Sequence, residues 1–130
     1  IPKIRADAPI YQGATEAVLE KGPWLRPKTP APPSGGNTVI VGHRFSYNPA
    51  VEQPFYHLDK LEIGDKIVIA WEGKTYVYSV SEKKVVTPTQ VEVEAPTKQR
   101  QLTMYTCTPL WNPVNRLVII ATPYDGEAQL

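Results

Sequence analysis

Leu102-Thr103-Met104-Tyr105-Thr106-Cys107 is an apolar, β-branched stretch that ends on the only cysteine of the chain. Its composition is typical of a β-strand, and successive side chains of a strand point to opposite faces. Leu102, Met104 and Thr106 are expected to pack inside the protein. The other face then carries Thr103, Tyr105 and Cys107. One thiol cannot form an internal disulfide, so we expect its value to be chemical.

A reactive thiol needs a nearby base or positive charge, because the thiolate is the attacking species. The chain offers two histidines, His43 and His57. His43 follows the apolar run Thr38–Val41 and Gly42, so it lies where a strand ends. His57 lies in a short helical turn among apolar neighbours, which fits a structural histidine. The alternative for the thiol is an inert core residue, since free cysteine often behaves as a small hydrophobe.

Four further apolar, β-branched runs are bounded by Gly, Pro, Asn or Asp and predict strands. They are Thr38–Val41, Lys66–Trp71, Lys74–Ser81 and Arg116–Thr122. The tight connection Trp71-Glu72-Gly73-Lys74 predicts a β-hairpin between the second and third of these runs. Shorter extended pieces are expected at Ile4–Ala6, Pro9–Tyr11, Val85–Val86 and Val91–Val93.

Helix is predicted to be minor. Thr15–Lys21 is a candidate helix, with Thr15 as a possible cap and Gly22-Pro23 as the stop, and a second short turn is expected at Phe55–Leu61. The proline-rich stretch Pro23–Gly36 has the composition of a linker. We interpret it as a long loop within one domain of residues 1–130, because the segment before it is too short to form its own core.

Composition bounds the function. Hydrophobic residues make up 42% of 130 residues, which suits one domain with a sizeable core. Fourteen prolines, about twice the usual ~5%, favour strands and loops over a helical bundle. The charges, 14 basic against 13 acidic, are scattered, so a nucleic-acid partner is disfavoured. No apolar stretch approaches the ~20 residues that span a bilayer.

Several motifs resemble those of the sortase family. Thr103-Met104-Tyr105-Thr106-Cys107 is similar to the sortase Thr-Leu-x-Thr-Cys signature, with Met in place of Leu, a volume-conserving change. Arg116 stands in the position of the sortase arginine. Further matches cover nearly the whole chain in the expected order: Ile1-Pro2-Lys3-Ile4, Asp7-Ala8-Pro9-Ile10, Gly35-Gly36-Asn37, Gly42-His43-Arg44, Phe55-Tyr56-His57-Leu58-Asp59-Lys60-Leu61, Gly64-Asp65-Lys66-Ile67 and Cys107-Thr108-Pro109.

The resemblance implies an all-β fold, the eight-stranded sortase β-barrel with one or two short helices. It also implies a catalytic set of His43, Cys107 and Arg116. Cys107 would attack the Thr–Gly bond of a C-terminal sorting motif and form a thioacyl-enzyme. His43 would act as acid and then as base, and the Arg116 guanidinium would stabilise the oxyanion. For Arg116 the alternative is an exposed cation paired with a carboxylate.

Substrate contacts are expected from Tyr105, Thr106 and Trp111. Tyr105 would form a wall of an outer groove beside the thiol, or else be an ordinary packing aromatic. Thr106 would assist the oxyanion, although alternation directs its side chain away from Cys107. Trp111 lies in the loop Thr108–Asn115, which departs from the patterns of the family. The loop carboxylates do not have the spacing of a calcium site, so no metal and no cofactor are expected.

The motifs resemble class E sortases most, and class D second. Class E favours a Leu-Ala-x-Thr-Gly motif, and Leu-Pro-x-Thr-Gly stays open. The implied partners are surface proteins or pilins, and an amine acceptor from a peptidoglycan stem peptide or a pilin lysine. The implied location is the outer face of a Gram-positive-type membrane, with an N-terminal anchor upstream of Ile1. Two other readings remain: a cysteine hydrolase, and a noncatalytic barrel that binds peptides.

Overall fold

The computed structural model describes residues 1–47, 50–108 and 114–124. Its regular structure is almost entirely β, and every helix among the described residues is a short 3₁₀ turn. The strands are β1 (Trp24–Leu25), β2 (Asn37–Val41), β3 (Phe45–Tyr47), β4 (Ala50–Glu52), β5 (Lys66–Trp71), β6 (Lys74–Val86), β7 (Gln101–Thr108) and β8 (Asn115–Pro123). The 3₁₀ turns are η1 (Pro2–Ile4), η2 (Glu16–Glu20), η3 (Pro32–Ser34), η4 (Leu58–Lys60) and η5 (Val91–Glu94).

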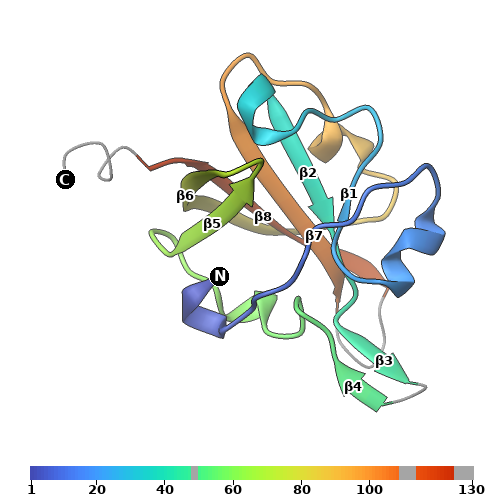
Figure 1. Ribbon diagram of the computed structural model, residues 1–130. Helices are drawn as coiled ribbons and strands as arrows, with labels where there is room; N and C mark the ends of the chain where they lie inside the picture. Colours follow the sequence, from blue (N-terminus) through green and yellow to red (C-terminus); the bar gives the residue numbers. More distant parts are fainter. Residues whose placement is uncertain (48–49, 109–113, 125–130) are drawn as a thin grey trace.

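Six strands form one curled sheet in the order β1-β2-β7-β8-β6-β5, and β3 pairs with β4 in a separate hairpin. β7 lies near the middle of this sheet, parallel to β2 and antiparallel to β8. Figure 1 shows that the sheet is curled, which gives a half-barrel. The all-β class expected from the sequence is therefore confirmed.

All five predicted strands are present. The run Lys66–Trp71 is β5 with the expected bounds, and it pairs with β6 through the predicted hairpin, where Trp71 is opposite Lys74. The two turn residues, Glu72 and Gly73, have φ angles of 48° and 81°. Positive φ at both central positions is the requirement of the type I′ turn, whose twist matches that of the strands.

Other boundaries were wrong. β6 runs on to Val86 because the backbone of the charged stretch Glu82–Lys84 pairs with β8 after a register shift at Val80/Glu82. Backbone pairing needs no apolar side chains on an exposed strand face.

Three short elements differ in type. The extended piece expected at Ile4–Ala6 is absent, because Ile4 ends the 3₁₀ turn Pro2–Ile4 and Arg5 follows with a positive φ of 54°. Val91–Glu94 is a 3₁₀ turn where an extended piece was expected, and the predicted helix is a 3₁₀ turn over Glu16–Glu20. Thr15 makes no side-chain capping bond. The conformation of a piece of three to five residues depends on the surface that it covers more than on its own propensity.

The proline-rich stretch Pro23–Gly36 is part of the sheet domain. Trp24 and Leu25 are buried in β1, which pairs with β2. Tyr11 adds an isolated bridge to Trp24. The beginning of this stretch is therefore paired with the sheet.

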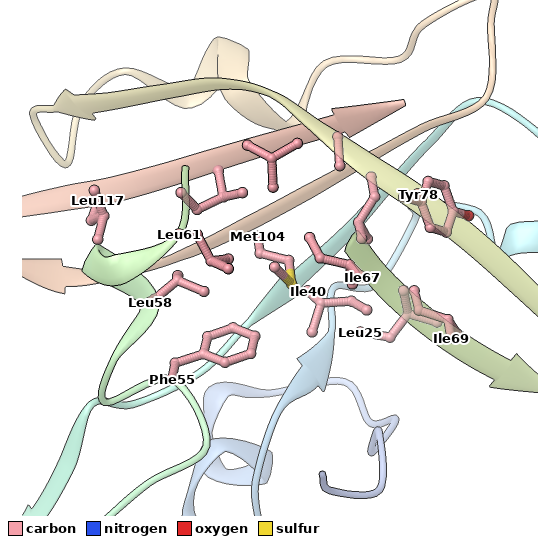
Figure 2. Close-up of a cluster of buried hydrophobic side chains, with 14 residues drawn as sticks. Leu25, Ile40, Phe55, Leu58, Leu61, Ile67, Ile69, Tyr78, Met104 and Leu117 are labelled. Atoms are coloured by element: carbon pink, nitrogen blue, oxygen red, sulfur yellow. The ribbon is translucent and has the colours of Figure 1, made fainter. Parts of the chain in front are cut away.

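The core lies on both faces of β7. On the concave side, Leu102 and Met104 belong to a large apolar cluster with Ile40 and Ile67. Figure 2 shows Phe55, Leu58 and Leu61 covering this cluster from the segment after β4. On the opposite face, Tyr105 packs in a smaller cluster of Val39, Val41, Val86, Val93 and Val118. The alternation predicted for the Leu102–Cys107 stretch is therefore confirmed.

Candidate active site

Cys107 lies one residue before the end of β7 and is exposed. Its antiparallel partner on β8 is Arg116. Directly opposed residues of an antiparallel pair project from the same face, with Cβ atoms about 4.5–5.5 Å apart. The register thus brings the thiol and the guanidinium to one face of the sheet, although nine positions separate them in the chain.

His43 reaches the same end of the sheet from the other side of β7. Val41 is the parallel partner of Tyr105, and the Gly42 N–H donates to the Tyr105 carbonyl at 3.2 Å. β2 ends at Val41, so His43 follows the end of this strand by two residues, as Cys107 follows Tyr105 on β7. In Figure 1 the end of β2 lies beside the end of β7, where the β3–β4 hairpin begins. The three predicted residues therefore come from neighbouring positions on three adjacent chain segments.

Two residues around His43 fix the path of the chain. A Cβ at Gly42 would lie 2.7 Å from Cδ2 of Phe55, closer than packed carbons approach, so glycine is required for this contact. Arg44 donates from Nε and Nη2 to the Tyr56 carbonyl, each at 3.1 Å, and Nη2 is 3.0 Å from Asp59 Oδ1. These contacts hold the backbone on both sides of the histidine.

The His43 side chain remains 44% exposed. Its Nε2 lies 3.8 Å from Oε1 of Glu20, a residue of η2. This is an ion-pair distance but not a hydrogen bond, and the Glu20 side chain is 84% exposed. The histidine is therefore open to solvent and to a substrate.

His57 packs edge-on against the Tyr56 ring, with centroids 4.7 Å apart, and immediately precedes η4. It is half-buried. This setting agrees with the structural role expected from its neighbours in the sequence.

Arg116 is held by an aromatic ring rather than by a carboxylate. Its guanidinium carbon lies 4.8 Å from the centroid of the Tyr105 ring. Across residues 1–47, 50–108 and 114–124, no carboxylate lies within ion-pair distance of this side chain. The alternative of an exposed cation paired with a carboxylate therefore finds no support in the described part of the chain.

Tyr105 is not the open groove wall that was expected. It is only 5% exposed, because η5 and the residues around it cover the outer face of β7. Its hydroxyl donates to Glu94 Oε2 at 2.6 Å. Burial, and then this bond to a carboxylate, raise the pKa of Tyr105 above its ordinary value of 10. The phenol is therefore a proton donor at any physiological pH.

Thr106 is buried on the concave side, opposite Cys107, and its hydroxyl has no partner among the described residues. Only its backbone is available to the face that carries the thiol. Trp111 lies outside the described residues, as does most of the loop that contains it.

Sequence reasoning missed Arg26 and Glu94. Glu94 was placed next to an extended piece, and Arg26 lies in the proline-rich stretch. In the structure, Arg26 Nε donates to Glu94 Oε1 at 3.1 Å. The residues are 68 positions apart, and no local motif predicts such a contact.

A cleft of about 950 Å³ lies elsewhere, between the N-terminal segment and β5. None of His43, Cys107 or Arg116 lines it. No group of three His, Cys, Asp or Glu side chains gathers as a metal site within the described chain. No helix among those residues is long and apolar enough to cross a membrane.

The family model of the sortase domain matches residues 1–124. The chain belongs to the sortase family. It is 31% identical to sortase SrtE1 of Streptomyces coelicolor over 92% of its own length, and it spans 37% of that relative. It is 27% identical to sortase D of Bacillus subtilis over 84% of its length, and spans 52% of it.

Solved sortases share the fold. A lid mutant of sortase A from Corynebacterium diphtheriae superposes with a TM-score of 0.86 at 33% identity, over all of this chain and 72% of that one. A sortase D5 transpeptidase from Clostridium perfringens gives a TM-score of 0.83 at 30% identity, over 95% of this chain and 75% of that one. The half-barrel is thus the sortase architecture, and the candidate site lies at the ends of its parallel pair of strands.

Proposed function

We propose that this sortase domain is a transpeptidase in which Cys107 is the nucleophile, His43 the proton-transfer group and Arg116 the oxyanion-binding cation. The main support for this proposal is the position of Cys107 relative to Arg116. Cys107 is exposed and directly opposite Arg116, and that guanidinium has no competing carboxylate in the described chain. A cation left unpaired beside a thiol is available for a transient negative charge.

The chemistry proceeds in two halves. The Cys107 thiolate attacks the carbonyl carbon of the Thr–Gly bond, and the carbonyl oxygen becomes an oxyanion stabilised by Arg116. His43 donates a proton to the departing glycine amine as the bond breaks, which leaves a thioester. An incoming amine then loses a proton to His43 and attacks the thioester, and the thiolate leaves.

The substrate is a surface protein or pilin with a Leu-Ala-x-Thr-Gly or Leu-Pro-x-Thr-Gly motif, following the class E and class D resemblance. The acceptor is an amine of a peptidoglycan stem peptide or a pilin lysine. We place the domain on the outer face of the cell membrane, anchored by a segment upstream of Ile1. Thr106, through its backbone, and Trp111 are candidate contacts to the substrate.

Intact mass spectrometry tests the proposal. The protein is incubated with each motif peptide, with and without an amine acceptor. We expect a covalent adduct of the mass of the peptide up to its threonine, which passes to the amine and is absent in Cys107→Ala. His57→Ala is the matched control for His43→Ala, and only the latter should abolish the adduct.

The outcomes separate the alternatives. An adduct that is released to water at the same rate with and without the amine indicates a hydrolase, which the exposed position of Cys107 would permit. No adduct and no cleavage, with the thiol titrated as free, would overturn the enzymatic proposal in favour of a peptide-binding barrel.

A further inference from the structure

A chain of side chains leads from the outer surface to the candidate site. Arg26 stacks over the Trp24 ring at 4.6 Å and binds Glu94 through Nε. Glu94 accepts from the Tyr105 hydroxyl with its other oxygen. The Tyr105 ring then supports the guanidinium of Arg116. These contacts connect β1, η5, β7 and β8. The chain therefore joins elements that lie far apart in the sequence.

We propose that Arg26, Glu94 and Tyr105 are positioning residues for Arg116. The Tyr105 ring is the platform on which the guanidinium lies, facing Cys107 on the neighbouring strand. Arg26 and the Tyr105 hydroxyl together occupy both oxygens of Glu94, which keeps this carboxylate from pairing with Arg116. The inference rests on the proposed function, because it assigns a purpose to the free guanidinium.

The geometry favours a platform over simple packing. A guanidinium over a tyrosine face is attracted by the ring quadrupole, and this attraction leaves its N–H groups free to bind an oxygen in the ring plane of the guanidinium. A carboxylate partner would occupy the same N–H groups in a bidentate pair. The ring therefore orients Arg116 without consuming the donors that the reaction needs.

The charges explain why Arg26 matters. Glu94 is mostly buried, with 21% of its side chain exposed, and Arg26 is 32% exposed. Both arginines lie close enough to lower the pKa of the Tyr105 hydroxyl, against the larger effects of burial and Glu94 that raise it. Without Arg26, Arg116 would be the remaining cation near this hydroxyl, and the Glu94 carboxylate would be attracted to it.

Steady-state transpeptidation of a motif peptide tests the inference. Tyr105→Leu removes the platform and should lower kcat by about 10- to 100-fold, the cost of a displaced catalytic group, with KM changed less than about 3-fold. Tyr105→Phe keeps the ring and should lose less than about 5-fold. Tyr76→Leu is the matched control, because Tyr76 supports Arg100 in the same way, with 5.4 Å between the Arg100 guanidinium carbon and the ring centroid.

The second arm tests the shielding. Arg26→Gln frees Glu94 and should lower kcat about 10-fold, consistent with partial loss of one oxyanion donor. The double variant Arg26→Gln, Glu94→Gln removes the competing carboxylate and should return kcat to within about 3-fold of the parent. A double variant no better than Arg26→Gln would mean that the ion pair is only a structural tie, and would overturn this part.

Nuclear magnetic resonance of the Arg116 Nε–Hε group gives a readout that needs no substrate. The ring current of Tyr105 should shift this proton upfield in the parent protein and in Tyr105→Phe, but not in Tyr105→Leu. Arg26→Gln should move it downfield toward a carboxylate-bound position. An unshifted Arg116 signal in the parent would overturn the inference even if the enzyme is active. An inactive parent with the expected shifts would instead reject the proposed function alone.

Discussion

The two faces of β7 are built on opposite principles. The concave face carries Leu102 and Met104, which pack in a cluster of aliphatic and aromatic side chains. The outer face carries Thr103 and Tyr105, and each hydroxyl on it donates to one named oxygen, of Asn37 and of Glu94. Cys107 ends this second face. Because its side chains alternate, the strand places apolar packing on one face and directed hydrogen bonds, together with Cys107, on the other.

The outer face is buried almost as fully as the concave one, which makes its polar contacts consequential. Asn37 is 2% exposed; it accepts from Thr103 at 2.7 Å and donates to the carbonyls of Val93 and Ala95 at 3.1 and 3.0 Å. Buried polar groups are costly unless they are bonded in this way. The network therefore fixes the segment around η5, which in turn places Glu94 behind Tyr105.

Arg116→Ala tests the chemical face and should have the largest effect. We expect turnover to fall about 10²- to 10³-fold, as for loss of an oxyanion donor. The free energy of unfolding should change by less than about 1 kcal/mol, because this half-buried side chain has no ion pair in the described chain. Peptide cleavage and urea unfolding are measured on the same samples. Arg100→Ala is the control, and an equal loss of turnover there would break the distinction.

Met104→Ala tests the concave face and should do the reverse. Loss of a buried methionine leaves a cavity and should cost about 2–5 kcal/mol in urea unfolding, while kcat of the folded fraction stays near that of the parent. Met104→Leu conserves volume and should cost less than about 1.5 kcal/mol. If kcat of the folded Met104 variants falls in step with their free energy of unfolding, the two faces of β7 are coupled.

Asn37→Ala tests the polar network beneath the site, with an intermediate effect. It leaves the Val93 and Ala95 carbonyls unbonded and should cost about 1–3 kcal/mol. Hydrogen exchange should accelerate in residues 91–95. Gln99→Ala, at an exposed position of the same connection, serves as control. Unchanged exchange in Asn37→Ala would mean that other contacts hold this segment.

Tyr78→Phe tests a buried hydroxyl on the concave face and should have the smallest effect at neutral pH. The Tyr78 hydroxyl has no partner among the described residues, so its removal should change stability by less than about 1 kcal/mol. Desolvation raises the pKa of Tyr78 from 10.0 to about 12. A raised folded-state pKa gives stability that is fully present below pH 10 and is lost as pH rises toward 12.

The phenylalanine variant should therefore lose less stability than the parent between pH 10 and 12, measured by urea unfolding across that range. Tyr105→Phe is the companion variant. The pKa of Tyr105 is also raised, so ionisation of Tyr105 also lowers the stability of the parent above pH 10. Parallel pH profiles of Tyr78→Phe and the parent would exclude Tyr78 as a source of the alkaline decline.

Local pattern was sufficient for part of the fold. The hairpin of β5 and β6 was predicted at its correct position, because Glu72-Gly73 and the alternating runs are near one another in sequence. The extension of β6 over Glu82–Lys84 was not predicted, because its side chains are charged and only its backbone pairs with β8. The short pieces at Ile4–Ala6 and Val91–Val93 were assigned wrongly for a related reason, since their conformation depends on what they cover.

The candidate site divides in the same way. His43, Cys107 and Arg116 were picked from motif and residue type, and the structure brings them to one end of the sheet. Tyr105 was expected to be open and is buried, because the 87–100 connection folds over its face. Arg26 and Glu94 could not be found, since their contact spans 68 positions and carries no local signal.

The sequence by itself determined the alternation of the Leu102–Cys107 stretch, because side-chain direction follows from the covalent geometry of a strand. It also supplied the residue types of the candidate site. The tertiary structure alone decided the register that sets Arg116 opposite Cys107, and the pairing that brings the end of β2, which His43 follows, beside β7. It also decided which carboxylate lies behind Tyr105. Register and long-range pairing depend on how the two buried faces pack, and no short stretch of sequence contains that information.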